Sequence, residues 1–230
     1  VGTTSQSLVD GARQGALEAV GGDLSLRLFH RPPRDTELAA ILREGNVSIS
    51  TELRPMARPV REDLTFGEPV LVEVKGVDGQ YPLYGKAETR SGKNLLQSLE
   101  LRDGEYGAVV DPSLLQALNL KTGGQVQIGA TRYRLRGIIK AEPDRAFRAF
   151  TLGPRIMVLN DSLPTTGLVN EGAEVYYYTR VNLPPKSDQP THARQALNRI
   201  DQAFPGSCWR IVNAHDGVPG VERTLEIAHV

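Results

Sequence analysis

The stretch Gly21-Gly22-Asp23-Leu24-Ser25-Leu26-Arg27-Leu28-Phe29 decides the fold of this 230-residue sequence. Its three leucines alternate with Ser25 and Arg27, and strict alternation is typical of a half-buried β-strand. On the N-terminal side, residues 1–20 carry apolar side chains three to four positions apart, which predicts an amphipathic helix. Gly21-Gly22 would end that helix. The sequence therefore opens with a helix and a strand joined by a glycine pair.

A short helix and a second strand follow. Asp35 can cap the helix and Gly45 can supply its left-handed end. Three apolar residues form its expected buried face: Leu38, Ile41 and Leu42. Residues 46–51 read as a strand that runs on towards Val60. Together with the first strand they make one strand-helix-strand unit, at residues 23–60.

The same order of elements returns near the other end of the chain. Residues 175–183 predict a strand, residues 190–204 a helix and residues 207–212 a strand. The last stretch, residues 220–230, has helical potential. The repeat concerns the order of elements and not the sequence itself.

Between the two units the pattern is mostly β. Asp111-Pro112 follows a short apolar strand and predicts a helix start. Residues 125–139 predict a hairpin with its turn at Gly129-Ala130, and residues 155–159 predict another strand. We therefore expect an α+β fold of two strand-helix-strand units with an inserted β-rich domain.

Two domains are expected from this organisation. The first is discontinuous and consists of residues 1–83 and 171–230. The second is the β-rich insertion, residues 84–170.

Composition excludes several classes of protein. Lys plus Arg and Asp plus Glu both number 27, and this zero formal charge argues against non-specific binding of nucleic acid or anionic membranes. The longest run without Asp, Glu, Lys or Arg is residues 122–131, shorter than the roughly 18 apolar residues of a membrane-spanning helix. The chain starts at Val1 without a signal peptide, so we expect its natural start to lie upstream.

Motifs for catalysis and cofactor binding are weak. Residues 79–87 look like a phosphate loop, but the glycines are separated by five residues and Ala87 stands where Ser or Thr should bind magnesium. We therefore expect no ATP binding or hydrolysis by this chain. The single cysteine, Cys208, lies beside Trp209 in a predicted strand and is expected in the core. We assign no catalytic, cofactor-binding or metal-binding residue.

The histidines support only an alternative. His30, His192, His215 and His229 lack the i, i+4 spacing of a helical zinc site. His215-Asp216 follows a strand end, where catalytic residues can lie. A stand-alone soluble hydrolase using this pair is the alternative function.

Two basic segments are candidates for binding. Arg132, Arg134 and Arg136 would line one strand face, and a nucleic-acid-binding module built on them is the least favoured hypothesis because the net charge is zero. In residues 142–150, aromatic and arginine side chains occur without regular periodicity, as at protein interfaces. The candidate partner or substrate contacts are Arg145, Phe147, Arg148 and Phe150.

Several segments resemble one known family. They are Gly21 to Arg27, Tyr81-Pro82-Leu83-Tyr84-Gly85, Val110-Asp111-Pro112 with Leu120-Lys121-Thr122-Gly123, and Glu142-Pro143-Asp144-Arg145 to Leu152-Gly153-Pro154-Arg155. With the order of elements, they resemble the extracytoplasmic domain of MacB/FtsX-type ABC transporter permeases, in particular the YbbP-like subfamily. The resemblance covers essentially the whole chain, and its motifs are structural rather than catalytic.

The resemblance implies a place and a role. The discontinuous domain would be a membrane-proximal porter domain and the insertion a distal, sabre-like domain. Transmembrane helices would flank the chain in the bacterial inner membrane, with this part in the periplasm. A separate cytoplasmic ABC ATPase subunit would hydrolyse ATP.

The resemblance also implies substrates and partners. The domain would couple ATP hydrolysis to extraction or export of hydrophobic or lipid-like molecules, a mechanotransmission role without catalysis. A periplasmic esterase or lysophospholipase-type hydrolase would dock on it. No nucleic acid and no cofactor is expected.

Overall fold

The computed structural model describes residues 2–145 and 153–216. The helices are α1 (Gly2–Val20), α2 (Asp35–Leu42), α3 (Leu95–Leu99), α4 (Pro112–Leu118), α5 (Leu163–Thr166) and α6 (Gln189–Ala203). The strands are β1 (Leu24–Phe29), β2 (Asn46–Leu53), β3 (Met56–Val60), β4 (Val70–Leu71), β5 (Glu73–Val77), β6 (Glu88–Thr89), β7 (Tyr106–Val110), β8 (Gln125–Ile128), β9 (Thr131–Ala141), β10 (Arg155–Leu159), β11 (Tyr176–Asn182) and β12 (Arg210–Asn213). Three 3-10 turns are η1 (Pro143–Arg145), η2 (Asn160–Ser162) and η3 (Ala214–Asp216).

The strands form one long mixed sheet. Its order is β12-β1-β11-β2-β5-β10-β7-β9-β8-β3-β4, and β6 pairs with β9. β10 runs parallel to β5, and β7 runs parallel to β9, whereas the other pairings are antiparallel. The α+β fold class predicted from the sequence is confirmed.

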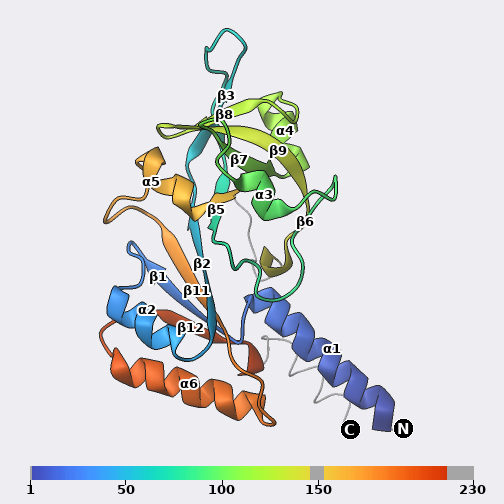
Figure 1. Ribbon diagram of the computed structural model, residues 1–230, viewed down its shortest axis with the longest axis vertical. Helices are drawn as coiled ribbons and strands as arrows, with labels where there is room; N and C mark the ends of the chain where they lie inside the picture. Colours follow the sequence, from blue (N-terminus) through green and yellow to red (C-terminus); the bar gives the residue numbers. More distant parts are fainter. Residues whose placement is uncertain (1, 146–152, 217–230) are drawn as a thin grey trace.

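At one end of the sheet, α2 and α6 pack on the leucine face of β1 (Figure 1). The alternating leucines of β1 are all buried there, with Ile41 of α2 and Ala193 and Ile200 of α6. The strand-helix-strand order predicted for both units is therefore present in the structure.

At the other end, β7, β8, β9 and α4 enclose a second core (Figure 1). Val126 and Ile128 of β8 pack with Tyr133 and Leu135 of β9, so the predicted hairpin is confirmed. Gly129 has φ +55°, and its Cβ position would be 2.3 Å from the carbonyl oxygen of Thr166, which explains why only glycine fits this turn.

The ends of α2 differ from the prediction. Its N-cap is Arg34, with Asp35 as the first helical residue, and its C-cap is Arg43 in the right-handed conformation. Gly45 does not have a positive φ, so it does not supply a left-handed helix end.

Three further local predictions were wrong. The strand expected to continue to Val60 breaks into β2 and β3, which lie at separate places in the sheet. Leu42, expected in the core, is 54% exposed, while Glu37 of the same helix is buried because Arg31 and Ser207 bind its carboxylate. Cys208 is exposed and has φ +59°, and it lies in the loop before β12 rather than in a strand. Residues 220–230 lie outside the described residues.

α1 leaves the body of the molecule at an angle (Figure 1). Only Ala16, Leu17 and Val20, all near its C-terminal end, are buried. At 1.5 Å per residue, the 19-residue helix is roughly 28 Å long. No helix among the described residues has the length and hydropathy needed to cross a membrane.

Candidate functional site

The attachment point of α1 is built from the glycine pair and Asp23. Gly21 has φ +84° and donates its N–H to the Leu17 carbonyl 2.8 Å away, which ends the helix. A Cβ at Gly22 would lie 2.8 Å from the carbonyl oxygen of Val181 on β11. Because glycine has no side chain, the backbone that follows α1 can lie directly against the backbone of β11.

Arg180 of β11 ties this attachment to the interior. Its Nε donates to the last carbonyl of α1, Val20, at 3.0 Å, and its Nη1 donates to Ser50 Oγ at 2.9 Å. Its Nη2 lies 3.2 Å from Asp144 Oδ2. One buried guanidinium thus joins α1, two strands and η1.

Asp144 and Lys75 form the centre of a buried charge network. Lys75 Nζ on β5 donates to both carboxylate oxygens of Asp144, at 2.7 and 2.6 Å, and to Glu142 Oε1 at 3.0 Å. The Tyr81 hydroxyl also donates to Asp144, at 2.8 Å. The side chains of the Lys75–Asp144 pair are each only 1% exposed, so each charge depends on its partner.

The network continues into the other half of the sheet. Arg155 Nε on β10 donates to Glu142 Oε2 at 3.2 Å, and the Arg155 backbone N–H donates to Asp111 at 2.8 Å. Arg145 binds the same Asp111 carboxylate with two guanidinium nitrogens, at 2.7 and 2.6 Å. Because Asp111 precedes the first residue of α4, the chain of contacts reaches from α1 to α4.

The neighbouring cations keep the Asp144 carboxylate ionised. Burial would raise the pKa of the Asp144 carboxyl, but Lys75 and Arg180 hold it well below its usual range. Burial lowers the pKa of the Lys75 ammonium, while Asp144 and Glu142 oppose that shift. Opposite charges placed this close stabilise each other strongly in a dry environment. We call Lys75, Glu142, Asp144, Arg155 and Arg180 the joint network.

A second buried pair adjoins the α1 attachment. His215 Nε2 of η3 lies 2.6 Å from Asp23 Oδ1, and both side chains are at most 2% exposed. Asp23 also accepts from Leu183 N at 2.8 Å and from the Tyr84 hydroxyl at 3.0 Å. Burial raises the pKa of Asp23, and these donors, His215 first, overcome it and lower the pKa. The pair links the chain after α1 to the chain after β12.

The predicted contact residues are only partly placed. Arg145 lies in η1 with its side chain 31% exposed and is paired with Asp111. Phe147, Arg148 and Phe150 lie outside the described residues.

The three strand arginines make contacts within the domain. Arg134 pairs with Glu105 at 2.9 Å, Arg132 donates to Gln127, and Arg136 donates to backbone carbonyls. These internal contacts give no support to a nucleic-acid-binding face.

Sequence reasoning missed the joint network as a site. Lys75 lies between Val74 and Gly76 on β5, and Arg180 lies between Thr179 and Val181 on β11. A charged residue inside a predicted strand is the signal that could have marked them. Within residues 2–145 and 153–216, no cluster of three His, Cys, Asp or Glu residues could hold a metal ion. The contacts observed in the joint network are ion pairs and hydrogen bonds between separate elements.

Comparison with known proteins identifies similar sequences. Residues 3–200 match the MacB-like periplasmic core domain family. The chain is 30% identical over 182 residues to an uncharacterized ABC transporter permease, YbbP, of Escherichia coli strain K12. The matched region is 76% of this chain and 20% of that protein, so the chain spans about one fifth of the length of this relative.

Two solved structures have a similar fold. The periplasmic region of MacB from Actinobacillus actinomycetemcomitans gives a TM-score of 0.52 at 12% identity, over 91% of this chain and 95% of that one. The extracellular domain of the noncanonic ABC-type transporter YknZ from Gram-positive bacteria gives a TM-score of 0.50 at 16% identity, over 83% of this chain and 100% of that one. At these identities the likeness concerns the fold. Together with the sequence matches, it confirms the resemblance predicted from the sequence.

Proposed function

Because the chain belongs to the MacB-like periplasmic core domain family, as the periplasmic domain of an ABC transporter permease, we propose that it relays movements of the membrane-spanning helices to a periplasmic substrate or partner. In this proposal the domain has no catalytic role. ATP is hydrolysed by a separate cytoplasmic subunit, and α1 continues towards the first transmembrane helix.

The observation that carries the proposal is the attachment of α1 to the joint network. Arg180 holds the last carbonyl of α1 and Asp144, and Asp144 holds Lys75. These three residues come from three separate sequence segments, on β11, η1 and β5. A tilt of α1 would therefore move β11, η1 and β5 together, because buried ion pairs resist separation.

The division into two domains remains a proposal. Residues 1–83 and 171–230 would form the membrane-proximal porter-like part, and residues 84–170 the sabre-like part. Lys75 and Arg180 would then belong to the first part and Asp144 to the second. The joint network would be the contact through which one part moves the other.

We further propose a hydrophobic or lipid-like substrate, extracted from the inner membrane, and a docked periplasmic esterase. Arg145, Phe147, Arg148 and Phe150 remain the proposed contacts with that substrate or partner. The observation that supports this assignment is the 31% exposure of the Arg145 side chain, whose guanidinium is held in place by Asp111.

The test uses the complete permease with its ATPase subunit in lipid vesicles. Arg180→Gln should leave ATP hydrolysis intact and strongly reduce ATP-dependent release of a fluorescent lysophospholipid. Arg194→Gln, on the exposed face of α6, is the control and should change neither quantity. Equal release by Arg180→Gln and the unaltered permease would overturn the relay.

The stand-alone hydrolase is disfavoured by geometry. His215 binds Asp23 and not the neighbouring Asp216, and its side chain is only 2% exposed. Among the residues that the structure describes, His215 Nδ1 has no hydrogen-bond partner, so no hydroxyl or thiol is paired with this ring as a nucleophile. Ester hydrolysis by the purified chain that disappears in His215→Ala would revive this alternative.

A further inference from the structure

Three arginines gather on the sheet face opposite α2 and α6. In the pairing of β1 with its two neighbours, Arg27 lies opposite Arg210 of β12 and Tyr178 of β11. Ser25, two residues earlier, lies opposite Arg180. Residues paired in this way, and those two positions apart on a strand, share one face of a sheet. Arg27, Arg180 and Arg210 therefore point to the same side.

Two of these guanidinium groups have no acidic partner among the described residues. Within residues 2–145 and 153–216, neither Arg27 nor Arg210 forms an ion pair, and Arg27 only stacks over the Tyr176 ring, 5.1 Å from its centre. Arg180 does pair with Asp144, but Asp144 is shared with Lys75, 2.6 Å away. Counting the side chains that the structure describes, this face consequently has a surplus of positive charge.

A cavity of about 250 Å³ lies against this face. The three arginines and the Asp144 side chain line it. Its apolar wall consists of Ala19 and Val20 of α1, with Val212 of β12 beside the arginines. Guanidinium groups bind phosphate and carboxylate oxygens through paired, charge-assisted hydrogen bonds. The apolar wall suits a hydrocarbon portion next to such a group.

We propose that this cavity binds the anionic headgroup of an amphiphilic molecule, with a phosphate or carboxylate held by Arg27, Arg180 and Arg210. The proposal rests on the proposed function, because that function has the domain receive a hydrophobic or lipid-like molecule extracted from the inner membrane. It names the substrate class as anionic amphiphiles. Since Arg180 also belongs to the joint network, a headgroup in the cavity would touch the residue that holds α1.

The experiment titrates the 230-residue chain with three probes by calorimetry. They are dihexanoyl-phosphatidylglycerol, which is anionic, dihexanoyl-phosphatidylcholine, which is zwitterionic, and inorganic phosphate. We expect the anionic lipid to bind about tenfold more tightly than either of the others. The combined variant Arg27→Gln, Arg210→Gln should weaken its binding at least about tenfold, as expected for loss of charge-assisted hydrogen bonds.

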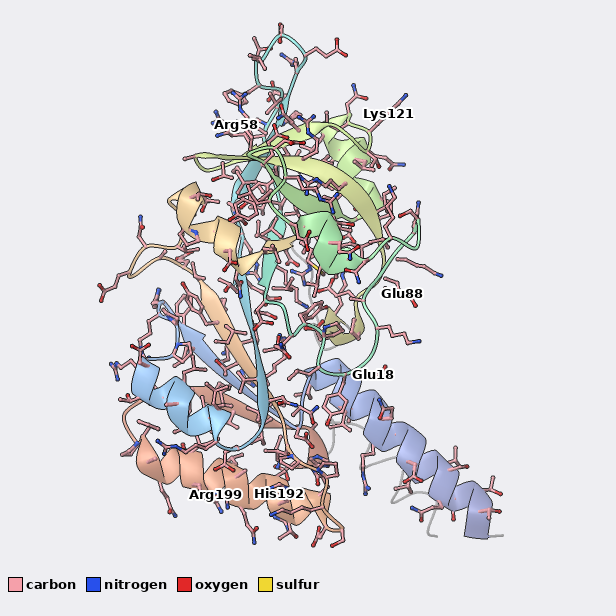
Figure 2. All side chains as sticks on the ribbon, in the orientation of Figure 1. Glu18, Arg58, Glu88, Lys121, His192 and Arg199 are labelled. Atoms are coloured by element: carbon pink, nitrogen blue, oxygen red, sulfur yellow. The ribbon has the colours of Figure 1, made fainter. Side chains whose placement is uncertain are left out.

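The matched control is Arg58→Gln. Arg58 also lies on a strand and over an aromatic ring, that of Phe66 at 6.0 Å, but Figure 2 places it at the end of the molecule opposite α6. Its substitution should leave lipid binding within about twofold of the unaltered chain. An equal loss in Arg58→Gln and in the combined variant would overturn the cavity as the site.

The remaining outcomes also decide the proposal. Equal affinities for the two lipids would contradict the claim that the cavity prefers an anionic headgroup. An affinity for inorganic phosphate equal to that for phosphatidylglycerol would contradict the claim that the ligand is an amphiphile. Failure here is separate from failure of the relay, because the relay is tested by ATP-dependent release in the complete permease. If the 230-residue chain binds no lipid but Arg180→Gln still abolishes ATP-dependent release in the complete permease, the lipid-binding cavity is refuted and the relay is not.

Discussion

Arg180 Nε donates a 3.0 Å hydrogen bond to the carbonyl oxygen of Val20, which is the last residue of α1. The same guanidinium lies 3.2 Å from Asp144. An arginine that holds both a helix end and a buried carboxylate fixes the direction in which the helix leaves the sheet.

Removing the charge of Arg180 should loosen α1 and destabilise the domain. Arg180→Gln leaves Asp144 with one cationic partner fewer in a buried site, and we expect a loss of about 3 kcal/mol in the free energy of unfolding. Urea unfolding checks this value, and hydrogen exchange should show faster exchange in the last turn of α1. Protection unchanged in that turn would contradict the contact's role.

Lys75 and Asp144 should show strong energetic coupling. Lys75→Met alone leaves two buried carboxylates without their ammonium partner, with an expected cost of about 4 kcal/mol. The double variant Lys75→Met, Asp144→Leu should be less destabilised than the sum of the single variants by at least about 1 kcal/mol. A double-mutant cycle by urea unfolding measures this difference, and strict additivity would contradict the coupling.

Gly22 and Gly11 should respond oppositely to alanine. A Cβ at Gly22 meets the Val181 backbone, so Gly22→Ala should lower stability by about 2 kcal/mol. Gly11 lies in α1 with nothing within 4 Å of the Cβ position, and Gly11→Ala should increase helical circular dichroism without lowering the melting temperature. Equal melting temperatures for the two variants would show that the close approach at Gly22 is unimportant.

Glu37 should make stability depend on acid pH. Burial raises the pKa of its carboxyl, but Arg31, Ser207 and the Arg34 N–H lower it to about 2. A lowered pKa means that the stabilisation is fully present above about pH 4.5 and is lost as the pH falls towards 2. The free energy of unfolding of the unaltered chain should therefore be about 3 kcal/mol larger than that of Glu37→Gln at pH 7. This difference should shrink between pH 5 and pH 2. A difference independent of pH would contradict the assigned ion pair.

His215 and Asp216 provide a test between structure and catalysis. His215→Gln should lower the melting temperature because it removes the partner of buried Asp23, whereas Asp216→Asn, in an exposed residue, should leave it unchanged. The hydrolase alternative instead expects both variants to lose ester turnover. Thermal melting and an esterase assay on the same samples separate the two interpretations.

The local pattern of the sequence was sufficient for most elements. The alternating leucines predicted β1, Asp111-Pro112 predicted the start of α4, and Gly129-Ala130 predicted the hairpin turn. These features depend on side-chain periodicity and on the φ that glycine and proline allow, which are properties of neighbouring residues.

The site could not be predicted in the same way. Lys75 and Asp144 lie 69 positions apart, and their contact depends on where β5 and η1 meet. The local sequence pattern does not indicate that β10 lies between β5 and β7 in the sheet. This strand order places Arg155 next to Glu142, where the two form an ion pair. A charged residue in a strand indicates that a partner exists, but the fold alone identifies the partner.

The most direct test of the relay is the distance between α1 and α6, measured by electron spin resonance on spin labels. The labels replace Leu8 and Asn198, both exposed, after the exposed Cys208 is changed to Ser. The account predicts one narrow distance distribution for the otherwise unaltered chain and a broad one for Arg180→Gln. A broad distribution before the substitution, or a narrow one that Arg180→Gln leaves unchanged, would contradict the claim that the joint network fixes α1 to the sheet.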